Sequence, residues 1–230
     1  MKTCYMCDAP ATGGEHVPPK CIFPEESRFR RDLIKVPSCD RHNSHKSKCD
    51  EYLKFVLTAA GGMNELALGI FGGSVMRSFD HVPHLVEKFT PDLQRVKLGD
   101  LETAGFKLDV PRFEHSITSI VRGLFFKMTG KKLVTGLRVA WAHMLLGDYS
   151  KAPFVDPILA AERRLPANYL GTNPRVFQYA FNTSKTGKKA MCRLRFYEGL
   201  PVCALWDIEN SAEIDALIAR QMHSTEGDVQ

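Results

Sequence analysis

The chain has 230 residues, of which 44% are hydrophobic and 25% charged, and its formal net charge is +5 at pH 7. This length allows one large domain, or a small module joined to a larger body. No run of about 18 uninterrupted apolar residues is present, so we expect no membrane span. The mild positive charge permits nucleic acid as a partner without requiring it.

Five of the seven cysteines fall within the first fifty residues. The opening Met1-Lys2-Thr3 is not followed by an apolar segment typical of a signal peptide, so we expect a cytoplasmic protein. An odd number of cysteines in such a chain argues against a disulfide framework and favours metal binding or burial.

The first half of the chain reads as a loop-rich segment followed by helices. Residues 1–50 carry few periodic apolar positions, so we expect this segment to need a bound metal ion in order to fold. A helix is expected from about Arg41 to Ala60, ended by Gly61 and Gly62. Its apolar face holds Cys49, Tyr52, Leu53 and Val56.

Further along, the apolar pattern predicts a glycine-interrupted helix over 63–79 and, after a loop at 80–83, a short helix to about Phe89. Residues 96–108 leave loop and strand open. An amphipathic helix is expected over 113–128, closed by Gly130. The same spacing predicts another helical stretch, from about Lys132 to Leu146.

The last third changes to strand patterns. Alternating apolar residues predict strands over 176–182, 190–197 and 201–206, with the turn between the first two at 183–189. A final helix is expected over about 211–222.

The strongest chemical signal is Cys4-x-x-Cys7 followed by Cys39-x-x-His42. Paired knuckles of this kind supply the four soft or borderline ligands that a structural zinc ion requires. The alternative is that these are unrelated reduced cysteines. Three nearby candidates lie outside the knuckle spacing: Cys21, Cys49 and His45.

Between the knuckles stands Glu15-His16, a carboxylate beside a group that titrates near neutrality. A hydrolase uses such a pair to hold Mg²⁺ and to deprotonate water, although most such dipeptides are plain surface. On the following helix, Asn43, Lys46 and Asp50 share one polar face. That face is either functional or simply solvated, with Asn43 as a cap.

Taken in order, C-x-x-C, E-H-V-x-P and C-x-x-H-N-x-x-K-S resemble the zinc-containing HNH endonuclease family over about residues 4–54. The resemblance implies a treble-clef-like ββα-metal module. The expected fold class is therefore α+β: residues 1–60 form the zinc-stapled module, and residues 61–230 form a mainly helical region followed by a C-terminal antiparallel β-meander. The second region would recognise substrate or dock a partner.

The resemblance also implies roles for single residues. His16 would be the general base, while Glu15 and Asn43 would hold a catalytic Mg²⁺ or Mn²⁺ ion. Asp32 falls where the family's middle Asn normally braces the catalytic loop, so the orientation of His16 must be secured by another contact. His42 replaces the more usual fourth cysteine, and zinc accepts either ligand.

Basic residues between and after the motifs are candidates for phosphate contacts. They are Arg28, Arg30, Arg31, Lys46 and Lys48. A second group at the predicted turn is either a further anchor or a solubility feature: Lys185, Lys188 and Lys189.

These features predict a metal-dependent endonuclease that hydrolyses phosphodiester bonds, with DNA favoured over RNA as its partner. From the resemblance alone, a role in genome or phage defence follows. The alternatives are a non-catalytic zinc-stapled module that binds nucleic acid or protein, and a structural cap on an unrelated helical enzyme. We expect no membrane partner, and a protein partner would dock through the C-terminal region.

Overall fold

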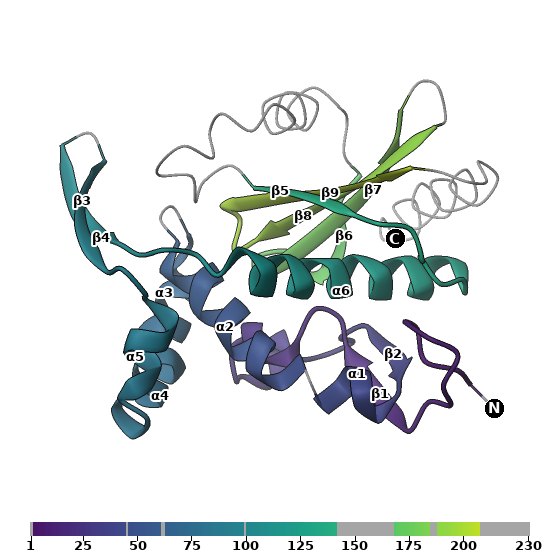
Figure 1. The fold of residues 1–230 in the computed structure, drawn as a ribbon, viewed down its shortest axis with the longest axis horizontal. Helices are drawn as coiled ribbons and strands as arrows, with labels where there is room; N and C mark the ends of the chain where they lie inside the picture. Colours follow the sequence, from purple (N-terminus) through teal and green to yellow (C-terminus); the bar gives the residue numbers. More distant parts are fainter. Residues whose placement is uncertain are drawn as a thin grey trace.

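In a computed structural model of the chain, the described residues are 2–44, 46–60, 63–98, 100–141, 168–184 and 188–207. They are arranged in layers, with a long helix lying between a small N-terminal module and an antiparallel sheet (Figure 1). A group of short helices and a two-stranded hairpin extend from one end.

The N-terminal module is a β-hairpin followed by helices. Its two strands pair antiparallel, and the long connection between them contains two short 3₁₀ turns. The helix predicted from Arg41 to Ala60 is confirmed as two consecutive helices; its expected end at Gly61 and Gly62 lies outside the described residues. The elements are β1 (Gly13–His16), η1 (Lys20–Ile22), η2 (Ser27–Phe29), β2 (Lys35–Ser38), α1 (Asp40–Ser44) and α2 (Lys46–Ala59).

The helix predicted over 63–79 is confirmed, with one π turn at its centre where Gly72 and Gly73 stand. The stretch 96–108, which the sequence left open, contributes to a hairpin. The elements of this region are α3 (Glu65–Ile70), η3 (Phe71–Val75), α4 (Met76–His81), α5 (His84–Phe89), β3 (Gln94–Leu98) and β4 (Leu101–Gly105).

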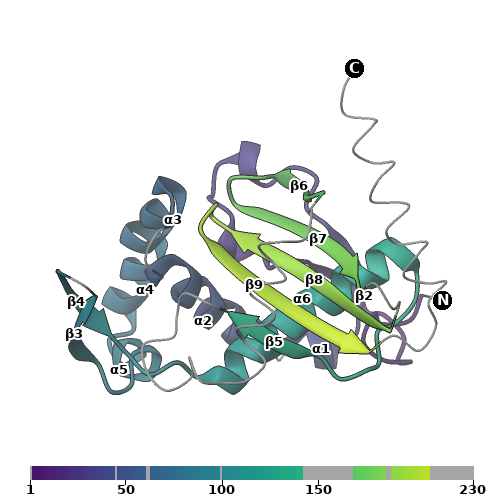
Figure 2. The same ribbon diagram turned by 90° about the horizontal axis from the view of Figure 1, so that it is seen from above.

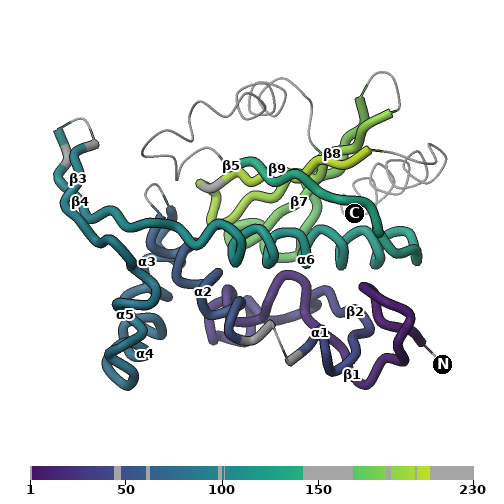
Figure 3. The backbone as a smooth tube through the Cα atoms, viewed as in Figure 1, coloured from purple at the N-terminus to yellow at the C-terminus, as the bar shows by residue number. Residues whose placement is uncertain are grey.

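The long central helix α6 (Val110–Thr129) matches the predicted amphipathic helix. Asp109 caps its start by accepting a hydrogen bond from the Arg112 N–H, and Gly130 ends it in a left-handed conformation at φ 75°. A side chain with a Cβ is strained in that conformation, which is why glycine suits the position. The helix contacts α2 and β2 on one side and the sheet on the other (Figures 2 and 3).

The C-terminal sheet has five antiparallel strands in the order β5-β9-β8-β7-β6. The three strands predicted near the C-terminus are confirmed as β7, β8 and β9, and two strands join them. The helix predicted over 211–222 lies outside the described residues. The strands are β5 (Arg138–Trp141), β6 (Leu170–Asn173), β7 (Phe177–Thr183), β8 (Lys189–Phe196) and β9 (Leu200–Asp207).

The helix predicted from Lys132 to Leu146 is wrong where the structure describes it, because β5 is a strand there. Val139, Ala140 and Trp141 are all buried, and β5 pairs with β9 more than sixty residues later in the chain. The pairing with β9 therefore determines the conformation of this segment, although its local apolar spacing favours a helix. Residues 142–146 lie outside the described part.

One large hydrophobic core runs through the layers, from Tyr5 and Val36 of the module through Ile117 and Val121 of α6 to Phe181 of the sheet. The boundary predicted at residue 60 is therefore crossed by continuous packing. Among the described residues, no helix has both the length and the apolar character needed to cross a bilayer.

Candidate functional site

The candidate metal centre is built from two turns, each closed by a main-chain hydrogen bond. The first turn lies between the bridged residues Thr3 and Pro10, and its Cys4 N–H donates to the Ala9 carbonyl at 2.9 Å. The second turn starts helix α1, where the His42 N–H donates to the Cys39 carbonyl at 3.1 Å. Each turn therefore presents two ligand atoms toward the other.

All four predicted ligands come together: the ligand atoms of Cys4, Cys7, Cys39 and His42 lie within 4.8 Å of one another. The Cys7 and Cys39 sulfurs are 3.8 Å apart. Nδ1 of His42 lies 3.4, 3.5 and 3.3 Å from the sulfurs of Cys4, Cys7 and Cys39.

These separations match a zinc tetrahedron. With Zn–S bonds of about 2.3 Å and a Zn–N bond of about 2.0 Å, the S···S edge is about 3.8 Å and the S···N edge about 3.5 Å. The Met6 N–H lies 3.4 Å from the Cys4 sulfur. Burial alone would raise the pKa of the Cys4 thiol, but backbone N–H groups of Met6, Cys39 and Cys7 bring that pKa below its usual value. The donor set thus fits a structural zinc ion.

Cys21 is not part of this group. Its thiol donates to the Asp50 carbonyl at 3.5 Å, and burial raises its pKa to about 12. A thiol that stays protonated is a poor metal ligand. Cys49 is half-buried on α2.

Glu15 and His16 end strand β1, and the register of the hairpin separates their side chains. Glu15 pairs with Val36, and His16 pairs with Lys35. Because successive side chains alternate across a strand, Glu15 shares the inner face with the buried Val36, whereas His16 shares the other face with Lys35. Glu15 is 6% exposed and His16 is half-buried.

Tyr5 connects the metal centre to Glu15. Its hydroxyl donates to Oε1 of Glu15 at 3.2 Å, and its own N–H donates to the Pro37 carbonyl at 2.9 Å. Burial raises the pKa of the Tyr5 phenol far above its usual value, with the charges of Cys4 and Asp50 adding to the effect. The phenol therefore stays protonated at neutral pH and can donate to Glu15. Sequence reasoning missed Tyr5, whose only signal was its place beside Cys4.

His16 lies in a cationic environment. Its pKa is lowered first by burial and then by the positive charges of Lys35 and Lys20. The imidazole is consequently neutral at pH 7, the form that can accept a proton. Neither lysine was singled out from the sequence.

The main chain after His16 is fixed on both sides. The Val17 N–H donates to the Ile34 carbonyl at 2.9 Å, which extends the hairpin by one pair. The Val17 side chain is fully buried against α6 at Gly123, where an added Cβ would lie 2.6 Å from Cγ2 of Val17. These contacts hold the main chain directly after His16.

Asp32 itself is exposed and has a left-handed backbone, with φ 52°. Asp tolerates this conformation better than most residues. A bracing hydrogen bond from its carboxylate is absent from the described part of the chain.

Asn43 is exposed on α1, directly after the metal-centre residue His42, and its N–H donates to the Cys39 carbonyl at 3.0 Å. Helix α1 contacts β1, so Asn43 and Glu15 come from adjacent elements.

The predicted phosphate-binding residues differ in solvent exposure and in the hydrogen bonds that they already make. Arg28 and Arg31 are exposed, but Arg30 is half-buried and donates to the Phe23 carbonyl at 3.1 Å. Lys48 is exposed, and the side chain of Lys46 is not described.

In the second basic group, Lys185 lies outside the described residues and Lys188 is exposed. Lys189 contacts Asp207 at 2.8 Å.

In comparisons with known proteins, no family model, no curated protein and no solved structure matches this chain.

Proposed function

We propose that this protein is a metal-dependent endonuclease of the HNH type, which hydrolyses phosphodiester bonds in nucleic acid. The observation that carries the proposal is the arrangement at the end of β1. Glu15 and His16 are adjacent on a hairpin strand that the Cys4-Cys7-Cys39-His42 cluster fixes beside α1, the helix that bears Asn43.

The proposed base is His16. A neutral imidazole on the face shared with Lys35 accepts a proton from the attacking water as the new P–O bond forms and the 3′ oxygen leaves. Lys20 and Lys35 add positive charge near His16, where a phosphate would approach. Electrostatic stabilisation of the developing negative charge is a major part of catalysis at such centres.

The donors for a catalytic ion are the carboxylate of Glu15 and the amide oxygen of Asn43. Oxygen donors of this kind suit Mg²⁺ or Mn²⁺, and Mg²⁺ needs only one or two protein ligands. When bound, such an ion supplies positive charge to the scissile phosphate. Tyr5 orients the Glu15 carboxylate through its hydrogen bond.

One observation favours a second candidate, the non-catalytic binding module. Glu15 is almost completely buried and is already engaged by Tyr5, an arrangement that also suits a purely structural carboxylate. In that case the zinc-stapled module would hold nucleic acid without cutting it.

Cleavage assays with Mg²⁺ or Mn²⁺ separate the two candidates. We expect the purified protein to cut plasmid DNA only when one of these ions is added. Glu15→Gln keeps the side-chain shape and removes the charge, so a higher ion concentration should be needed for half-maximal cleavage. Glu26→Gln is the matched control, because Glu26 is exposed and should leave cleavage unchanged. Absence of ion-dependent cleavage would support the binding module instead.

A further inference from the structure

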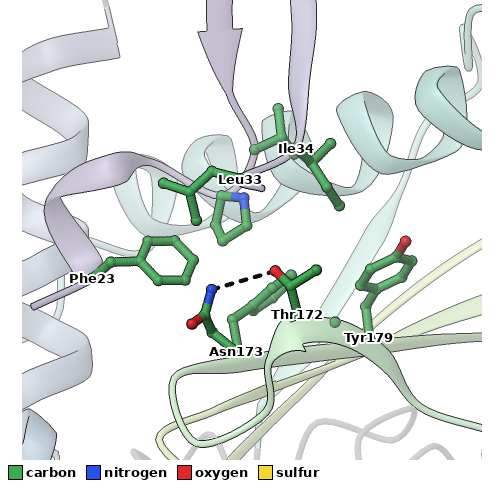
Figure 4. Close-up of a pocket in the computed structure, with 10 residues that line it drawn as sticks. Phe23, Leu33, Ile34, Thr172, Asn173 and Tyr179 are labelled. Atoms are coloured by element: carbon green, nitrogen blue, oxygen red, sulfur yellow. Dashed lines mark hydrogen bonds between the residues drawn. The ribbon is translucent and has the colours of Figure 1, made fainter. Parts of the chain in front are cut away.

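A cavity of about 230 Å³ lies between the hairpin loop and the edge of the C-terminal sheet. Phe23, Leu33 and Ile34 approach it from the loop, and residues of β6 and β7 face them from the sheet (Figure 4). Its full lining combines apolar, aromatic and amide groups: Val17, Pro18, Phe23, Leu33, Ile34, Gly171, Thr172, Asn173, Phe177 and Tyr179.

The cavity begins where the proposed catalytic hairpin ends. His16 and Lys35 are the last paired residues of β1 and β2, and the next pair outward, Val17 and Ile34, lines the cavity. Lys20 is exposed and follows Pro18 by two residues. Its positive charge also helps to lower the pKa of His16. The side chains of His16 and Lys35 lie on the opposite face of the hairpin from those of Val17 and Ile34. Lys20, however, stands in the chain between the lining residues Pro18 and Phe23, so the loop that walls the cavity also carries a cationic side chain.

This pairing of charge and apolar lining matches the two halves of a nucleotide. A phosphate suits the lysine charges around His16, and a flat aromatic base suits walls built from Phe23, Phe177 and Tyr179. The amide of Asn173 supplies polar atoms to a base edge; its Nδ2 donates to the Thr172 hydroxyl at 3.3 Å. The volume lies below the roughly 300–1,000 Å³ of pockets for larger ligands, so one ring system is the expected occupant.

We propose that this cavity binds one unpaired nucleobase of the substrate strand, next to the phosphate held beside His16. The proposal rests on the proposed function and specifies its substrate as single-stranded or locally unpaired nucleic acid. A base inside an intact duplex is stacked and paired, and it enters such a cavity only after the energetic cost of extrusion.

The test measures the affinity of a short fluorescent oligodeoxynucleotide without added Mg²⁺ or Mn²⁺, as a single strand and as a duplex of the same sequence. We expect the wild-type protein to bind the single strand more tightly at equal salt. Thr172→Trp places a large ring at the mouth of the cavity and should weaken single-strand binding about tenfold or more, the range expected for one lost base-stacking contact. Thr103→Trp on β4 is the matched control and should bind as the wild type does.

Asn173→Asp provides a second, nearly isosteric variant if Thr172→Trp does not fold. It keeps the cavity volume and adds a negative charge, so it should also weaken single-strand binding. Unchanged single-strand affinity in the folded variants, or a wild-type preference for duplex, would overturn the proposal.

Cleavage separates this inference from the proposed function. If the cavity proposal alone is wrong, His16-dependent cleavage persists in Thr172→Trp at the wild-type level. If the nuclease proposal alone is wrong, no cleavage occurs, yet Thr172→Trp still weakens single-strand binding.

Discussion

At the scale of single residues, Tyr5 joins the two chemical features of the N-terminal module. It follows the metal-centre residue Cys4 in sequence and donates to Glu15, the proposed ligand of the catalytic ion. A buried carboxylate that loses such a donor is left poorly satisfied, which typically costs about 1–3 kcal/mol. The Tyr5 phenol therefore links Glu15 to the turn that carries Cys4.

The variant Tyr5→Phe tests whether the Tyr5 hydroxyl positions the Glu15 carboxylate or only stabilises the fold. We expect the variant to keep its zinc and to need a several-fold higher Mg²⁺ concentration for half-maximal cleavage, because Glu15 is no longer oriented. Tyr197→Phe is the matched control: the Tyr197 hydroxyl is also buried and donates to the Ile22 carbonyl at 2.5 Å. Both variants should lose stability, but an Mg²⁺ requirement raised equally in both would contradict a positioning role for Tyr5.

At the scale of elements, helix α6 holds the hairpin in place through the contact between Gly123 and Val17. Gly123 is buried on helix α6, and because it has no Cβ the Val17 side chain can pack closely against it. Because Val17 follows His16 directly, the helix also fixes the main chain at the proposed base.

Gly123→Ala should therefore destabilise the protein, although alanine favours helix by about 1 kcal/mol over glycine. The added methyl meets the stiff, branched Val17, and overpacking of this kind costs about 1–3 kcal/mol. Gly69→Ala in α3 is the control, because no atom lies within 4 Å of the added Cβ, and it should be neutral or stabilising. Denaturant midpoints give the comparison, and a Gly123→Ala protein as stable as Gly69→Ala would refute this packing account.

The elements also show what local sequence patterns can predict. Helix α6 and strands β7, β8 and β9 carry strong periodicity together with nearby turn residues, and each was predicted. Strand β5 was predicted as helix because its conformation depends on pairing with β9, which no local pattern reveals. Strand β6 is short and contains Gly171 and exposed Thr172, so it has almost no strand signal.

At the scale of the whole molecule, the Cys4-Cys7-Cys39-His42 cluster belongs to a module that is continuous with the main core. Cys4, Cys39 and Tyr5 belong to the same hydrophobic cluster as α6 and the sheet. Cysteine and histidine pairs at this spacing form a local sequence pattern, so the sequence predicted the quartet. The cavity was not predictable, because its walls come from two segments more than 130 residues apart that only the tertiary fold brings together.

Zinc loss should consequently affect more than the first fifty residues. Metal analysis should find about one zinc per chain, and Cys39→Ser should lose it and lower the melting temperature of the whole protein. Zinc binding supplies folding free energy of order 10 kcal/mol in small sites. Cys49→Ser, outside the quartet, should keep the zinc. A Cys39→Ser protein that keeps the wild-type melting temperature would show that the quartet is not a structural zinc site.

The central claim is that His16 is the base of a phosphodiester hydrolase, and cleavage by His16→Ala tests it most directly. The substitution should lower the cleavage rate about 10²- to 10⁴-fold, the usual contribution of a general base. Zinc content and nucleic-acid binding should stay close to wild type, since His16 lies outside the quartet. His84→Ala on α5 is the matched control, because His84 is exposed, and it should cut normally. Cleavage by His16→Ala at the wild-type rate would contradict the account.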